Sequence, residues 1–132
     1  MDRGNEGGIT ECGGYVRVDF GSCNLTELSA LYRAFADFCL DNKVTHALLK
    51  AGDNDPNGHY RLRDALASMA QGADIAPEFK LALIPSTRAI EAIYREAQHH
   101  LRAAGFNAWV FASETEAVDW LEGRALGGLA AS

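Results

Sequence analysis

Short, unbroken apolar runs alternate along this chain with longer segments whose apolar residues recur every three or four positions. A strand that is apolar throughout must be buried on both faces, which occurs mainly in parallel sheets covered by helices. Segments with the three-and-four spacing are typical of amphipathic helices. The apolar runs are residues 47–49, 81–84 and 108–111, and the predicted helices are residues 25–42, 59–71, 87–104 and a last segment that stops at Gly123. The alternation predicts an α/β fold.

The N-terminal region has a different pattern. Two short strand-like runs, residues 9–12 and 15–20, are separated by Gly13-Gly14. Paired glycines between such runs favour a tight hairpin, because hairpin turns require positive φ angles. The second run alternates apolar and charged residues, which suits a strand with one solvated face. We therefore predict a mixed five-stranded sheet, with an N-terminal antiparallel hairpin, mostly parallel remaining strands and about four helices.

Helix-capping residues support these boundaries. Asn24 is followed three residues later by Glu27, and Ser113 by Glu116, which are the spacings of a capping box. Gly105 follows the third helix, where a C-terminal cap often requires glycine. We expect residues 9–123 to form one domain, between a flexible leader at 1–8 and a flexible tail at 124–132.

Composition excludes several classes of partner. The 132 residues carry a formal charge of −6, which disfavours nucleic acid as a partner. No apolar run is long enough to span a bilayer, so stable membrane insertion is not expected. The N-terminus lacks the apolar core of a signal peptide, and the odd number of cysteines lacks disulfide or zinc spacing, so we expect a cytoplasmic protein with free thiols. The bare edge of the hairpin could pair with a second copy as a homodimer.

One candidate ligand site lies where the strand at 81–84 leads into a helix. Pro85 ends the strand, and Ser86, Thr87 and Arg88 follow it. Helix N-termini present free N–H groups and the positive end of the helix dipole, which favour phosphate or carboxylate. In open α/β sheets, ligands bind at the carboxyl ends of strands. These residues are predicted to bind a small anion or lipid-like ligand; the alternative is an ordinary helix cap beside an exposed arginine.

The loop after the strand at 47–49 is the second candidate. Asp53, Asp55 and Asn57 stand at alternate positions before Gly58, and Asp64 is at the twelfth position of a calcium-loop pattern. Pro56 and the preceding strand depart from that pattern, and the alternative is a solvated turn. His59 shares this loop and is the histidine that we assign to a ligand-binding role.

The sequence nominates no catalytic residues, cofactor or resident metal. It contains no G-x-S-x-G elbow, no G-x-G-x-x-G fingerprint and no Walker-type lysine loop. Cys39 falls on the apolar side of a predicted helix, which favours a core position over a nucleophile. We therefore expect a protein without enzymatic activity.

The C-terminal half resembles a known family. Residues 79–84 form a strand before a long helix, residues 106–111 form a short strand ending in Phe111, and the helix after them carries Glu116-Ala117 and Trp120-Leu121. This ending, and the whole order of elements over about residues 9–122, is similar to STAS-like (SpoIIAA-like) domains.

The resemblance implies a STAS-like sheet and a regulatory role in binding an unidentified protein partner or small ligand. Some members of the broader group bind lipids. Anti-sigma-factor antagonists of this family carry a phosphorylatable serine or threonine at the start of the helix after the third strand. The corresponding residues 55–59 contain no hydroxyl group. We therefore expect a protein-interaction or ligand-sensing module that is not switched by phosphorylation at this position.

Overall fold

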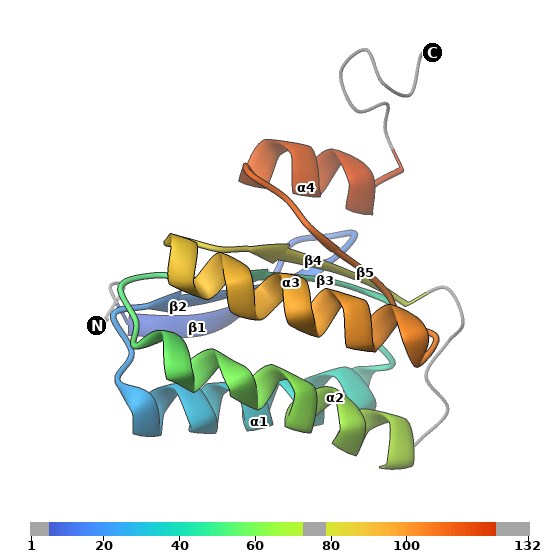
Figure 1. Cartoon of the computed structure of the whole chain (residues 1–132). Coiled ribbons are helices and arrows are strands. Elements are labelled where there is room, and N and C mark those ends of the chain that lie inside the picture. The colour runs from blue at the N-terminus through green and yellow to red at the C-terminus, as the bar shows by residue number, and fades with distance from the viewer. Residues whose placement is uncertain (1–5, 73–78, 124–132) are drawn as a thin grey trace.

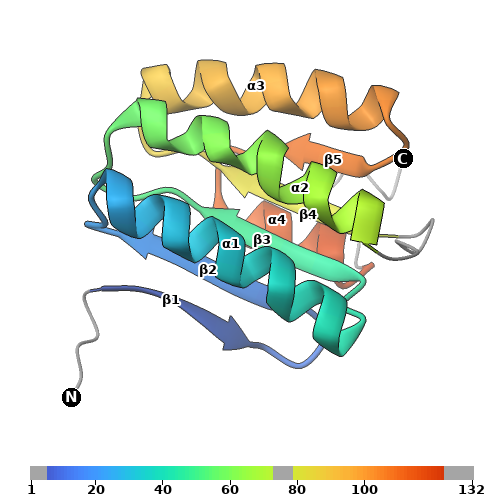
Figure 2. The same ribbon diagram turned by 90° about the horizontal axis from the view of Figure 1, so that it is seen from below.

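The computed structural model describes residues 6–72 and 79–123, which form an α/β domain. A five-stranded sheet separates two helical layers (Figures 1 and 2). Helices α1 (Leu25–Asn42), α2 (Arg61–Gly72) and α3 (Arg88–Ala103) lie on one face, and the shorter α4 (Glu114–Leu121) lies on the other. The predicted fold, a mixed five-stranded sheet with four helices, is confirmed. The predicted tail 124–132 and the first five residues of the predicted leader lie outside the described residues.

The strands lie side by side in the order in which they occur in the sequence. They are β1 (Glu6–Glu11), β2 (Val16–Gly21), β3 (His46–Lys50), β4 (Lys80–Ile84) and β5 (Asn107–Val110). Strands β1 and β2 are antiparallel, and every other neighbouring pair is parallel. Parallel pairing brings the carboxyl ends of β2 to β5 to the same end of the sheet, where loops can form a ligand site.

Both faces of the central strands are buried, which explains their unbroken apolar sequences. Val18, Leu49 and Leu83 are fully buried in the core beneath α1, α2 and α3. Leu48 and Ala82 alternate with them and pack on the opposite face with residues of α4. Burial of such side chains contributes about 1.5–3 kcal/mol each relative to leaving them exposed.

The hairpin between β1 and β2 turns at Gly13, whose φ angle is 83°. This angle lies in the region that favours glycine, and the Cys12 N–H donates to the Tyr15 carbonyl at 2.8 Å across the turn. Strand β1 begins at Glu6 rather than at Ile9, since Gly8 still pairs with Asp19 of β2.

The helix starts follow the side-chain caps that the sequence indicates. Both halves of the Asn24–Glu27 capping box are formed. The second helical segment begins earlier than predicted, as a 3-10 helix, η1 (Pro56–Tyr60), that leads into α2. Its start is favoured because the Asp55 side chain accepts from the Asn57 N–H, and Pro56 is compatible with the first helical position.

A cluster of charged side chains holds the start of α4 against the sheet. Glu114 accepts hydrogen bonds from Arg17 at 2.6 and 3.3 Å and lies 3.4 Å from Lys50. The bond to Arg17 is the main cause that lowers the pKa of Glu114 below its usual value.

Over residues 6–72 and 79–123, no helix combines the length and apolar composition needed to cross a membrane.

Candidate functional site

The predicted anion site lies at the carboxyl end of the parallel strands. After β4, Pro85 cannot donate a backbone hydrogen bond, and the chain turns into α3. Thr87 is the N-cap of α3, and its Oγ1 accepts from the Ile90 N–H at 3.2 Å. The Ser86 hydroxyl donates to the Gly52 carbonyl at 2.6 Å and so ties this turn to the loop after β3. Both hydroxyl groups therefore have structural roles besides any contact with a ligand.

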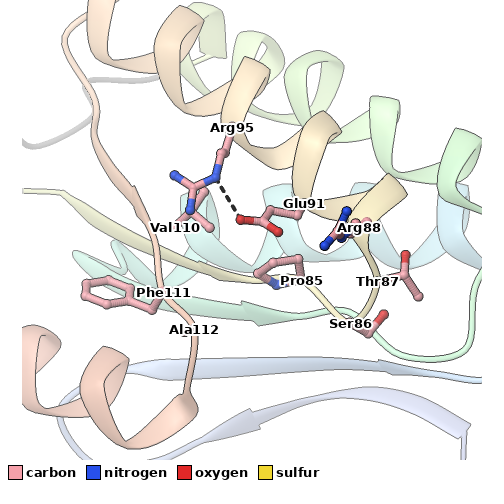
Figure 3. A pocket seen from close by; sticks show the side chains of 9 residues that line it. All are labelled: Pro85, Ser86, Thr87, Arg88, Glu91, Arg95, Val110, Phe111 and Ala112. Atoms are coloured by element: carbon pink, nitrogen blue, oxygen red, sulfur yellow. Dashed lines mark hydrogen bonds and ion pairs between the residues drawn. The ribbon is translucent and has the colours of Figure 1, made fainter.

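A cavity of about 290 Å³ opens beside this turn (Figure 3). One wall is the turn and the first two turns of α3, and the other is the segment that leaves β5. The lining residues are Pro85, Ser86, Thr87, Arg88, Glu91, Arg95, Val110, Phe111 and Ala112. The cavity thus combines backbone N–H groups at a helix start with charged side chains, whereas the Phe111 ring points away from the turn and packs against Trp120 (Figure 3).

The cavity carries an excess of positive charge. Arg88 and Arg95 contribute two guanidinium groups, and Glu91 contributes one carboxylate, which accepts from Arg95 Nε at 2.9 Å. This ion pair is largely exposed, and such pairs contribute little to stability. Within the described part of the chain, Arg88 has no ion-pair partner. Its guanidinium can therefore bind an anion without first breaking an internal bond.

Sequence reasoning predicted Ser86, Thr87 and Arg88, and the structure brings all three to one cavity. The sequence did not predict that Glu91, Arg95 and Phe111 line the same cavity. A signal for the first two was present, because positions 88, 91 and 95 follow the three-and-four spacing of one helix face. Phe111 comes from the segment that follows β5, and only the tertiary structure brings that segment here.

His59 lies elsewhere, in the core beneath the helices, and is fully buried. Its Nδ1 is 2.7 Å from the Tyr32 hydroxyl and 3.1 Å from the Tyr94 hydroxyl, and its Nε2 is 3.1 Å from Asn54 Oδ1. It does not line the cavity with Ser86, Thr87 and Arg88. Its predicted role in ligand binding stays a prediction, and the contacts that it makes here are within the protein.

The hydrogen bonds of Asn54 define the roles of the histidine nitrogens. The Asn54 amide nitrogen donates towards the carbonyls of Phe20, Gly21 and Cys23, and its Oδ1 accepts from the Gly52 N–H. Because Oδ1 is an acceptor, His59 Nε2 carries the proton and Nδ1 accepts from a tyrosine hydroxyl. Burial lowers the pKa of His59 from 6.5 to about 4, so the ring is neutral near pH 7.

This buried histidine predicts a loss of stability in mild acid. The folded pKa of about 4 lies below the unfolded value of 6.5, so the contribution is present above pH 6.5 and is lost as the pH falls towards 4. We expect the free energy of unfolding to fall by about 2 kcal/mol between pH 7 and pH 5. Urea denaturation at the two pH values measures the change. His59→Gln should remove most of this difference, whereas His100→Gln, at an exposed position, should retain it. The prediction would be contradicted if the free energy of unfolding fell equally between pH 7 and pH 5 in the original protein and both variants.

The carboxylates of the possible calcium loop do not converge. Asp55 caps η1, and Asp64 is exposed and lies 3.5 Å from Arg61. In residues 6–72 and 79–123, no group of three His, Cys, Asp or Glu side chains could hold a metal ion. The geometry therefore gives no support to the calcium hypothesis for Asp53, Asp55, Asn57 and Asp64.

Cys39 occupies the core position that its spacing indicates. It is 3% exposed, and burial raises the pKa of its thiol to about 12. A thiol with this pKa is protonated near neutral pH and is a poor nucleophile.

Comparisons with protein-family models, curated proteins and solved structures found no match to this chain.

Proposed function

We propose that this protein is a non-enzymatic ligand-sensing module that binds a small anion in the cavity at the start of α3. One observation carries the proposal: Arg88, Arg95 and the first turn of α3 line the same cavity at the carboxyl ends of β4 and β5. Thr87 already accepts from the Ile90 N–H, which leaves the N–H groups of Arg88 and Ala89 to solvent or a ligand. Guanidinium and helix N–H groups both favour phosphate and carboxylate.

The size of the cavity favours a small anion over the lipid-like alternative. Its volume of about 290 Å³ lies at the lower end of the range for small-molecule sites. Pro85 and Val110 add a limited apolar surface, enough for a short carbon skeleton beside the charged group. A phosphate monoester or a small carboxylate fits these features better than an acyl chain.

The STAS-like resemblance is compatible with this proposal and widens it to regulation. The order of strands and helices, with β1 antiparallel at one edge, supports that assignment at the level of topology. In this reading, anion binding would change how the module presents its surface to a protein partner.

The first test is thermal unfolding with added inorganic phosphate, sulfate or acetate. A ligand at about one hundred times its Kd stabilises the folded state by about 2.7 kcal/mol, or roughly 10 °C in Tm for a domain of this size. We expect Arg88→Ala and Arg95→Ala to reduce the shift at least by half. Arg33→Ala, which changes an exposed arginine on α1, should leave it unchanged.

Glu91 provides a variant with the opposite sign. Its carboxylate holds Arg95 and competes with an incoming anion. Glu91→Gln should therefore tighten phosphate binding about threefold to tenfold, or about 0.7–1.4 kcal/mol. Absence of a phosphate, sulfate or acetate shift in both the original protein and this variant would reject the anion site.

A further inference from the structure

A second surface combines aromatic and basic side chains at the β5 edge of the sheet, contributed by β4, β5, α4 and the end of α3. We call it the tryptophan face and define it by Lys80, Arg102, Asn107, Trp109 and Trp120. The Arg102 guanidinium lies 4.0 Å from the centre of the Trp109 ring, and the Lys80 ammonium lies 5.1 Å from that of Trp120. Both tryptophans of the chain are therefore paired with a cation.

The members of this face are connected across neighbouring elements. Lys80 of β4 is the register partner of Asn107 of β5. Asn107 Oδ1 accepts from Trp109 Nε1 at 3.1 Å and from Arg102 at 3.5 Å. Trp120 packs against Phe111, the residue after β5, with ring centres 5.3 Å apart. The two cation–aromatic pairs thus belong to one surface.

The side chains of this face that still have hydrogen-bond donors available are the cations Lys80 and Arg102. Trp109 is 40% exposed, although it is a large apolar side chain. In the described part of the chain, neither Lys80 nor Arg102 has a carboxylate partner. Their recorded hydrogen bonds go to the Trp120 carbonyl and to Asn107, so donors remain on both side chains.

The neighbouring sheet edge is less accessible than the face. Strand β5 is the last strand of the sheet, but its Val110 N–H donates to the Gln98 side chain of α3 at 2.7 Å. A strand added at this edge would have to displace that bond. A partner is therefore expected to contact the side chains of the face rather than to extend the sheet.

We infer that the tryptophan face is a docking surface for an acidic segment of a partner protein. Tryptophan and arginine contribute disproportionately to binding energy at protein interfaces, and the carboxylates of the partner would complement Lys80 and Arg102. The apolar side chains of the same segment would pack on the exposed ring of Trp109. Because the chain as a whole carries a net charge of −6, it repels an acidic segment over most of its surface. This small basic surface is where such a segment can approach. The overall charge also disfavours nucleic acid, whose affinity depends on many cationic contacts.

Binding is tested with a short fluorescein-labelled peptide of alternating glutamate and leucine, followed by fluorescence anisotropy on the full chain. We expect Arg102→Glu and Trp109→Ala to weaken binding about tenfold, or about 1.4 kcal/mol. Tyr60→Ala and Arg63→Glu are matched controls, since they change an exposed aromatic and an exposed arginine away from this face. Circular dichroism establishes that each variant is folded.

A second measurement uses the intrinsic fluorescence of Trp109. In Trp120→Phe, Trp109 is the only tryptophan, so peptide binding should change its emission directly. Added salt should weaken binding by screening the carboxylates. The inference is overturned if the original protein does not bind the peptide, if Arg102→Glu binds it equally well, or if a lysine-leucine peptide binds as tightly. Stronger binding to a single-stranded oligonucleotide or to phosphatidylserine vesicles would also overturn it. Phosphate binding at Arg88 is measured separately, so either proposal can fail alone.

Discussion

Gly52→Ala is expected to lower the free energy of unfolding by about 3–5 kcal/mol, although it adds only one methyl group. A Cβ atom at residue 52 would lie 2.0 Å from the Gly21 carbonyl oxygen. That oxygen belongs to the backbone and cannot rotate away. It also accepts from the Asp53 N–H at 2.8 Å, so movement of Gly21 would weaken this bond as well. Urea denaturation measures the loss.

Gly14→Ala is the matched control for this substitution. A Cβ atom at residue 14 would meet no other atom within 4 Å. Its φ angle is also outside the positive range, so alanine should change stability by less than about 0.5 kcal/mol. If Gly52→Ala were as stable as Gly14→Ala, the close approach of the loop after β3 to the end of β2 would be wrong.

Asn54→Ala is expected to cost about 3 kcal/mol of folding free energy, because it removes the centre of a partly buried hydrogen-bond network that includes His59. The substitution leaves His59 Nε2 without its acceptor, and the Gly52 N–H loses its bond to Oδ1. It also removes the donor to the carbonyls at the end of β2. Denaturant unfolding at pH 7 provides the measurement.

Two further variants separate the network from the loop that carries it. Asn57→Ala changes an exposed asparagine whose side chain has no recorded bond in the described residues, and should alter stability by less than about 0.5 kcal/mol. Asn54→Asp retains an acceptor for His59 but replaces the amide donors with a second oxygen. We expect it to be at least as destabilising as alanine, since that oxygen would face backbone carbonyls. A mild effect of Asn54→Asp would show that the donated bonds matter little.

The local sequence was sufficient for most of the secondary structure. Asn24 and Glu27 predicted the start of α1, and the apolar run at 81–84 predicted β4, because caps and strand patterns depend on neighbouring residues. The boundary at residue 59 was less accurate. Pro56 begins a 3-10 helix with Asp55 as its N-cap, whereas the residue types there favour a turn.

The candidate sites were only partly accessible from the sequence. Ser86, Thr87 and Arg88 were predicted because a strand end followed by a helix start is visible in one stretch of sequence. Glu91 and Arg95 complete the charge of that cavity from the next two helical turns. The sequence does not predict the tryptophan face, because Trp109 and Trp120 fall at strand and helix spacings that are typical of core side chains. That spacing does not reveal that Trp109 remains 40% exposed on the edge strand β5.

The sequence by itself determined the alternation of strands and helices, because periodicity, caps and turn residues act over a few positions. The tertiary structure decided which side chains meet. It enclosed His59 between Tyr32 and Tyr94, residues that are 27 and 35 positions away along the chain. It also placed the start of α3 beside the end of β5 and left Trp109 exposed. These contacts join distant segments through packing and hydrogen bonds, and no local pattern in the sequence specifies them.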